Sequence, residues 1–194
     1  MNDHLTSAVV NHVLSACEFT TQVRFSELSF DGDQLGYKIA ISTDFEDRLD
    51  GEELSEPESL IFNVPLTTPH VFILVTDGAQ ERIARIVANL EQYERQGRHL
   101  TGDSFIALDN DSYLLDHGKV GAVFLPVSDS FYLDRLQPTL GVDGRCLHFL
   151  YVVFLNEVES HLLHENGRDA LFEKWVEHGR GITSMDDGLE SVED

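Results

Sequence analysis

The sequence predicts a single α/β (α+β) domain in which helices pack on a mixed, mainly antiparallel sheet. Apolar residues recur at helical spacing near the N-terminus, in the middle and near the C-terminus of the 194-residue chain. Between these segments lie short apolar or alternating runs, bounded by glycine- and proline-containing turns. The run 147–155, LHFLYVVFL, contains one polar side chain, His148, and is typical of a central strand buried on both faces.

The N-terminal region is expected to form a helix followed by a hairpin. Residues 3–17 place apolar side chains on one helical face, after the acidic Asp3. Residues 21–29 and 35–41 are predicted strands, and Asp31-Gly32 between them suits a tight turn. The next stretch, 44–58, is dense in carboxylates and has little periodicity, so we expect a solvated loop or a short helix.

The middle of the chain is expected to alternate strands with one long helix. Residues 60–64 and 70–76 are predicted strands, separated by a turn that contains prolines. Residues 79–96 show the clearest helical pattern, with Asp77 as the expected N-cap and Gly97 past the end. The buried stripe of this helix is expected to be Ile83, Ile86, Val87 and Leu90.

The C-terminal region is expected to contain two helices after the apolar strand. Asn156 is a candidate N-cap, and Glu159 has the capping-box spacing. Gly167 is expected to end the first helix, and Gly179 the second. We expect one domain over residues 1–187 and an acidic tail over 188–194, with fraying from Asp186 onward.

The C-terminal region contains an ordered pattern: an apolar strand ends in a small polar residue, a Glu lies on the next helix, and a Gly precedes an Asp-Ala-Leu helix. The residues in this pattern are Asn156, Glu159, Gly167, Asp169, Ala170 and Leu171. In this respect the chain resembles the suppressor of fused domain family. Residues 97–108 and 120–127 are similar to other parts of the family, so that the resemblance covers roughly residues 70–187. It implies a suppressor of fused-like domain of the compact bacterial type.

The charge of the chain is strongly negative, at a formal −22. The first 60 residues carry 13 acidic and 3 basic side chains, and residues 141–194 carry 12 and 4. Such a protein repels nucleic acid and anionic membranes and attracts basic partners. Adaptation to solubility or to a salt-rich cytoplasm explains the same composition equally well.

The remaining composition favours a cytoplasmic protein. The chain contains no apolar run that could span a bilayer, and its first residues lack the pattern of a signal peptide. Cys17 and Cys146 are far apart in the sequence and are expected to be buried free thiols in a reducing compartment.

Several ionisable residues are candidates for catalysis or metal binding, but none has a recognised spacing. Glu157, His161 and His164 lack the zinc-protease arrangement and are expected to be exposed helix residues. His70 and His148 are expected to be buried or half-buried structural histidines. Asp109 and Asp111 lack the other ligands of a calcium loop and are expected in a polar turn. We therefore predict no catalytic residue, no metal site and no cofactor.

Two classes of function remain, and the first is a noncatalytic protein-binding module. The resemblance implies this class, because animal members hold a transcription factor and compact bacterial members are similar to immunity proteins that neutralise toxins. We expect an immunity or antitoxin-type protein whose partner is a basic protein such as a toxin, with no direct binding to nucleic acid or membrane. The predicted contact residues are Asp44, Glu46, Asp47, Asp50, Glu52 and Glu53.

The alternative class is an enzyme, most plausibly a metal-assisted hydrolase that uses histidines and carboxylates. It requires that some of its candidate histidines meet in space. These candidates are His70, His117, His148, His161 and His164. A duplex-mimicking inhibitor of DNA-binding proteins is a variant of the first class.

Overall fold

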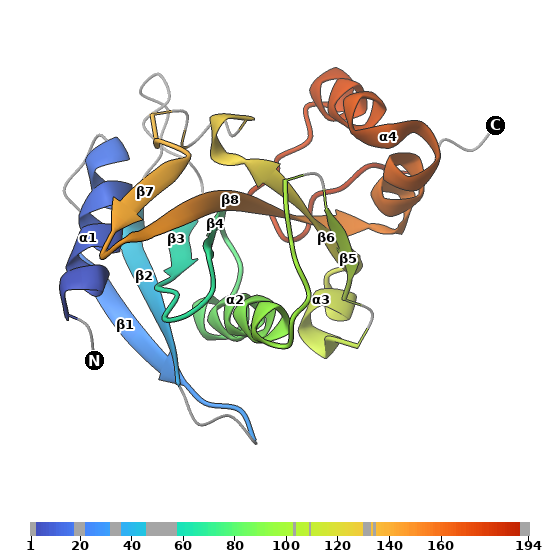
Figure 1. Cartoon of the computed structure of the whole chain (residues 1–194). Coiled ribbons are helices and arrows are strands. Elements are labelled where there is room, and N and C mark those ends of the chain that lie inside the picture. Colours follow the sequence, from blue (N-terminus) through green and yellow to red (C-terminus); the bar gives the residue numbers. More distant parts are fainter. Residues whose placement is uncertain are drawn as a thin grey trace.

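The computed structural model describes residues 3–17, 22–31, 36–45, 58–102, 104–108, 110–129, 133 and 135–190. Within these residues eight strands form one sheet, and helices cover both of its faces (Figure 1). The elements are α1 (Asp3–Ala16), β1 (Val23–Leu28), β2 (Tyr37–Phe45), β3 (Glu58–Asn63), β4 (His70–Thr76), α2 (Gln80–Arg95), β5 (Phe105–Ala107), α3 (Ser112–Asp116), β6 (Lys119–Pro126), the 3-10 turn η1 (Val127–Asp129), β7 (Thr139–Val142), β8 (Arg145–Asn156) and α4 (Glu157–His178). No helix of this described part is long and apolar enough to cross a membrane.

Strand β8 lies at the centre of the sheet, as the sequence predicts. The order is β1-β2-β3-β4-β8-β6-β5, and β7 pairs with β8 in addition. The pair β4–β8 is parallel, whereas every other described pair is antiparallel. The prediction of a mixed, mainly antiparallel sheet is therefore confirmed.

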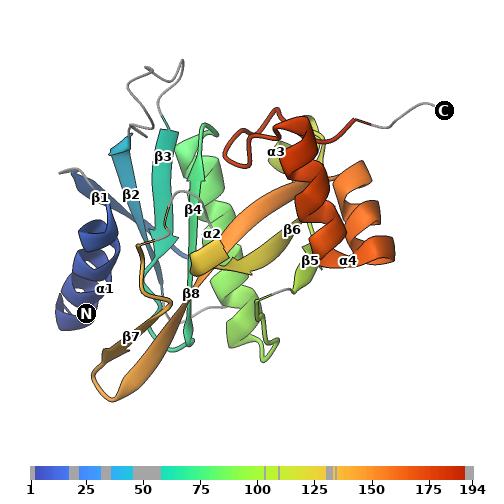
Figure 2. The same ribbon diagram turned by 90° about the horizontal axis from the view of Figure 1, so that it is seen from above.

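Both faces of β8 are buried because helices pack on each side of the sheet. Tyr151 and Val153 belong to a core that also contains residues of α1 and α4. Leu150, Val152 and Phe154 belong to a second core with α2 and α3. Figure 2 shows α1 and α4 on one side of the sheet and α2 on the other. This burial explains why β8 has almost no polar residue in its second half.

Helix α2 forms where its apolar spacing predicts it, but it is not capped as expected. Its N-cap residue is Ala79, which makes no side-chain cap. Asp77 instead accepts a hydrogen bond from the backbone N–H of Met185 at 2.8 Å, so its carboxylate serves a long-range contact. Gly97 follows the helix with a φ of +84°, which glycine adopts without strain.

The predicted capping box at the start of α4 is present. Glu159 N donates to Asn156 Oδ1, and Asn156 N donates to Glu159 Oε2, each at 2.9 Å. The two predicted helices are one element with a break at Gly167, where φ is 83° and ψ is 178°. Gly179 closes the element in the left-handed conformation.

The predictions for the tail and the thiols need correction. Leu189 is 7 % exposed and packs in the core, and its carbonyl accepts from Asn156 Nδ2 at 2.8 Å. The chain is therefore packed as far as Leu189, contrary to the predicted fraying from Asp186, whereas the division into a domain and an acidic tail stays a prediction. Both cysteines are free, but Cys146 is exposed rather than buried. Cys17 is half-buried, and burial raises the pKa of its thiol to about 11.

Candidate functional site

The predicted contact residues lie almost entirely outside the described residues. Only the backbone of Asp44, near the end of β2, is described, and Glu46, Asp47, Asp50, Glu52 and Glu53 are not. The described residues on either side of this stretch, Phe45 and Glu58, are paired across β2 and β3. The contact assignment itself stays a prediction.

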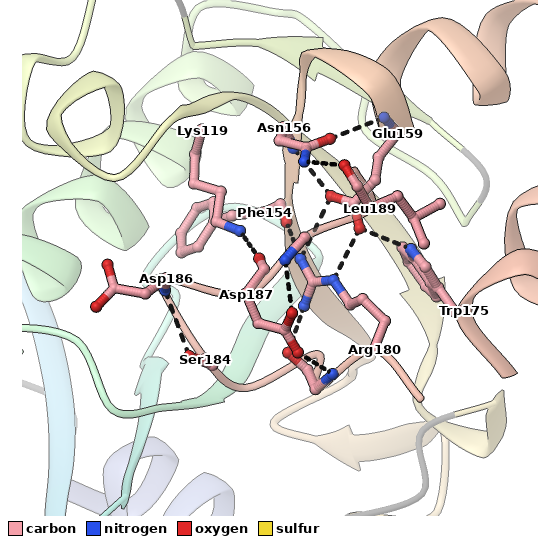
Figure 3. A network of polar contacts seen from close by, with 12 residues as sticks. Lys119, Phe154, Asn156, Glu159, Trp175, Arg180, Ser184, Asp186, Asp187 and Leu189 are labelled. Carbon is pink, nitrogen blue, oxygen red and sulfur yellow. Dashed lines mark hydrogen bonds and ion pairs between the residues drawn. The ribbon is translucent and has the colours of Figure 1, made fainter. Parts of the chain in front are cut away.

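The C-terminal strap, defined as residues 180–189, ties the ends of several strands together. Thr183 Oγ1 donates to Glu58 Oε1 at 2.5 Å, at the start of β3. Asp77 N, just after β4, donates to the carbonyl of Thr183 at 3.3 Å. The amine of Lys119, at the start of β6, donates to the carbonyl of Asp187 (Figure 3). The strap thus contacts β3 and β6 and the end of β4, and one of its contacts is with Glu58, the first described residue after the acidic stretch.

A buried ion pair anchors the strap to α4. Arg180 Nε donates to Glu159 Oε1 at 2.8 Å, and the two side chains are 1 % and 0 % exposed. Trp175 Nε1 donates to the same carboxylate oxygen at 2.9 Å. Arg180 Nη2 also donates to the carbonyl of Phe154 at 2.9 Å. Figure 3 shows these groups pointing toward one another. Both charges are therefore held within the fold.

Lys119 is the second buried cation of this network. Its residue is 1 % exposed, which is rare for lysine. Burial is the main reason why its pKa is lowered to about 8. The positive charge of Arg180 lowers it further, whereas Glu159 and Asp187 act in the opposite direction. Lys119 consequently loses its proton more readily than an exposed lysine.

A second polar cluster lies between α2 and the sheet. Asn63 Nδ2 donates to Glu91 Oε2 at 2.9 Å, and Arg95 Nη2 donates to Glu91 Oε1 at 2.8 Å. Burial raises the pKa of Glu91, while Asn63 and Arg95 oppose this effect. The guanidinium of Arg95 lies 4.1 Å from the ring centre of Tyr37. This cluster fixes the last turns of α2 against β2 and β3.

Two of the candidate histidines meet beside this cluster. His70 Nδ1 lies 2.5 Å from Glu94 Oε1, and the side chains are 13 % and 3 % exposed. The rings of His70 and His148 have centres 5.8 Å apart. His70 is half-buried and paired, as predicted, whereas His148 is exposed, contrary to the prediction. Adjacent positions in the parallel β4–β8 register bring them together.

The other three candidate histidines are separate from this pair. His117, the residue after α3, lies 2.6 Å from Asp186 of the strap. His161 and His164 are exposed on α4, as predicted, and His161 pairs with Glu165 at 3.2 Å. Over the described ranges no three His, Cys, Asp or Glu side chains are arranged to hold a metal ion.

The remaining predicted turn and the cleft nearest the strap offer no site for a substrate. Asp111 N-caps α3 by accepting from Tyr113 N and Leu114 N, in keeping with the predicted polar turn, whereas Asp109 lies outside the described residues. A cleft beneath the strap has room for about one water molecule. It is lined by Leu74, Val75, Thr76, Val152, Phe154, Ile182, Thr183, Ser184 and Met185.

Comparison with known proteins identifies the fold. No protein-family model and no curated protein matches the chain. A suppressor of fused homologue from Neisseria gonorrhoeae FA 1090, however, superposes with a TM-score of 0.66 at 11% identity, over 94% of each chain. The chain has the suppressor of fused fold.

Two further suppressor of fused structures support this assignment. The Sufu–Fu complex matches with a TM-score of 0.55 at 11% identity, over 96% of this chain and 91% of that chain. Drosophila Suppressor of Fused matches with a TM-score of 0.53 at 10% identity, over 96% of this chain and 51% of that chain. The shared suppressor of fused fold therefore includes the N-terminal third, where the sequence resemblance is absent.

Sequence reasoning missed the two buried cations. Lys119 opens the apolar strand β6, and a lysine at such a position is a signal that could have been used. Arg180 stands between two glycines after α4, and nothing in that spacing names Glu159 as its partner. Glu94 continues the predicted apolar stripe of α2, four residues after Leu90, so a carboxylate at this position was a signal that could have been used. Its partner His70 still requires the structure.

Proposed function

We propose that this suppressor of fused-like protein is a noncatalytic, cytoplasmic protein-binding module of the immunity or antitoxin type. Its partner is a basic protein, such as a toxin that it neutralises. The observation that carries the proposal is a suppressor of fused fold over 94% of the chain, combined with a net charge of −22. One solved structure with this fold is the Sufu–Fu complex, in which that protein is in complex with another.

The fold buries a few charges of both signs. Lys119 and Arg180 are buried. Arg145 donates to the carbonyls of Pro65, Leu66 and Thr68, so that its charge is engaged within the fold. Four carboxylates are buried as well, those of Glu58, Glu91, Glu94 and Glu159. Most of the net negative charge therefore remains available at the surface, where it favours long-range attraction of a basic partner.

The acidic segment is the proposed contact region. Apart from Asp44, which lies in β2, its proposed contact residues follow Phe45 and precede Glu58. Phe45 and Glu58 are paired across β2 and β3, so both ends of the segment lie at one end of the sheet. Charges gathered at one place act mainly on the rate of association, while buried anchors set the rate of dissociation. The proposed contacts are Asp44, Glu46, Asp47, Asp50, Glu52 and Glu53.

The experiment is affinity capture by the full-length protein in host extract, followed by reconstitution with each purified basic candidate. We expect a stoichiometric complex that weakens with added salt, and a partner whose mass is unchanged after prolonged incubation. If no basic protein forms such a complex, the proposal fails.

The hydrolase remains a second candidate because His70, oriented by Glu94, lies next to His148. Processing of the partner with turnover, abolished by His70→Gln, would establish the hydrolase instead. The matched control is His161→Gln, because His161 is exposed on α4, which packs on the other face of the sheet from His70 and Glu94.

A further inference from the structure

The exposed arginines of α2 and of the turn after it have no carboxylate partner. The chain has 35 acidic and 13 basic residues, so an exposed cation has many possible partners. Exposed cations elsewhere use them, because Arg24 pairs with Glu81 and Lys174 pairs with Glu177. Three exposed arginines, in contrast, make no hydrogen bond and no ion pair with any described residue: Arg82, Arg85 and Arg98. We call these three residues the arginine patch.

The carboxylates of α2 leave the positive charge of the patch uncompensated. This helix contains Glu81, Glu91 and Glu94. Glu81 is engaged with Arg24, and Glu91 and Glu94 are buried against the sheet. The exposed acids of α4 lie elsewhere, because α4 and α2 cover opposite faces of the sheet (Figure 2). The outer surface of α2 therefore offers free positive charge on a chain whose net charge is −22.

The stability of α2 does not explain why arginine occupies these positions. Arg82 lies in the first turn of the helix, where the partial positive charge of the helix end disfavours a cation. Arg82 and Arg85 are three positions apart, so they are neighbours on the helix surface and their like charges repel each other. An anion that binds both guanidinium groups would offset these two unfavourable effects.

Aromatic rings hold two of the three arginines in place. The guanidinium carbon of Arg85 lies 5.7 Å from the ring centre of Phe30, and that of Arg98 lies 4.5 Å from the ring centre of Tyr93. A guanidinium that contacts a ring keeps its N–H groups available to donate to a ligand. A side chain that is already ordered also loses less entropy when a ligand binds.

We propose that the arginine patch binds a carboxylate-rich stretch of a partner protein. The planar guanidinium matches a carboxylate and donates two parallel hydrogen bonds to it, and every cation of the patch is arginine rather than lysine. The 16 residues of α2 span about 24 Å, which an extended stretch of about seven residues covers. This contact goes beyond the proposed function, because it uses cations on α2 and does not involve the acidic segment.

A carboxylate-rich stretch suits this chain better than a nucleic acid does. A nucleic acid carries a phosphate at every nucleotide, so the charges beyond the patch would meet the remaining acidic surface. So few phosphate contacts also give little affinity at physiological salt. A protein stretch, in contrast, can place a few carboxylates at the arginines and neutral side chains on either side of them.

The test is fluorescence anisotropy of a labelled probe peptide, about seven residues of alternating glutamate and glycine, titrated with the full-length protein. We expect saturable binding at low salt that weakens as salt is added. Arg82→Gln combined with Arg85→Gln should weaken binding by ~3–30-fold, which corresponds to the loss of two exposed ion pairs. Arg82→Lys combined with Arg85→Lys should weaken it less than this, because the charges remain while the paired hydrogen bonds are lost.

The matched control is Arg168→Gln combined with Lys174→Gln, which removes two cations from α4 and gives the same net charge. It should bind the peptide like the unchanged protein, and circular dichroism checks that each variant is folded. The proposal fails if the peptide does not bind, or if the control loses as much affinity as the Arg82 and Arg85 variant.

Two other occupants of the patch are distinguished in the same experiment. Tighter binding of a thymidine oligonucleotide than of the peptide would assign the patch to nucleic acid. Salt-sensitive dimers that disappear in the variant with glutamine at positions 82 and 85 would assign it to a second copy of the chain. Either result would overturn the proposal.

Discussion

Glu159 and Arg180 form an ion pair that is closed to solvent, with Nε and Oε1 2.8 Å apart. Arg180→Met removes the cation and leaves the Glu159 carboxylate buried beside Trp175. Loss of one partner of a buried pair costs ~3–5 kcal/mol, because the other charge stays in a poorly solvated site. We expect urea denaturation to show a loss of this size. The control is Lys174→Met, which breaks an exposed pair with Glu177 and should leave the midpoint almost unchanged.

The lowered pKa of Lys119 predicts that the stability of the fold depends on pH. Its native pKa of about 8 lies below the ordinary value of 10.5, so between these values the unfolded chain binds more protons than the folded one. The free energy of unfolding should therefore rise with pH in this window, by ~2–3 kcal/mol. Below the window Lys119 is charged in both states, so the folded chain bears the whole cost of burying that charge. The measurement compares the unchanged protein with Lys119→Met in urea titrations across the window. A difference that stays constant with pH would show that Lys119 does not titrate early.

Substitution of Phe154 tests how β8 packs against α2. Its side chain lies in the core on that face and is 5 % exposed. Phe154→Ala should lower the free energy of unfolding by ~3–5 kcal/mol, through lost burial and the cavity left behind. The matched control is Val176→Ala on α4, where the side chain is 73% exposed. Equal melting temperatures for the two variants would contradict the assignment of Phe154 to the core.

Salt should stabilise the protein. At a net charge of −22 the folded chain repels itself, and added ions screen this repulsion within about a Debye length. We expect the melting temperature to rise from low to molar sodium chloride. A melting temperature indifferent to salt would mean that the acidic residues are already compensated locally.

Features encoded by local spacing were predictable from the sequence. The capping box of Asn156 and Glu159, the apolar stripe of α2 and the doubly buried β8 each depend on residues a few positions apart. The partners of ionised groups were not predictable, because they join distant segments. Thr183 donates to Glu58, which is 125 positions away in the sequence. The carboxylate of Asp77, which was expected to cap α2, instead accepts a hydrogen bond from Met185 of the strap.

The same contrast between local spacing and long-range contacts applies to the candidate sites. Sequence gives the identity of His70 and His148, but only the parallel register of β4 and β8 places them side by side. Their neighbour Glu94 comes from α2, which follows β4 along the chain and packs on the same sheet face. The acidic segment, in contrast, was predicted to contact a partner only because its carboxylates are dense in the sequence. Binding measurements are needed to test this role.

The proposed capture of a basic partner is tested most directly by association kinetics with two charge-matched variants. One variant neutralises acids of the proposed contact segment, Asp47, Asp50, Glu52 and Glu53. The other neutralises exposed acids of α4, Glu165, Asp169, Glu173 and Glu177. Both change the net charge equally, so that only the position of the lost carboxylates differs. We predict that the first variant associates more slowly and with a flatter salt dependence than the second, while its dissociation rate is little changed. Association at the same rate for the two variants and the unchanged protein, at every salt concentration, would contradict the account.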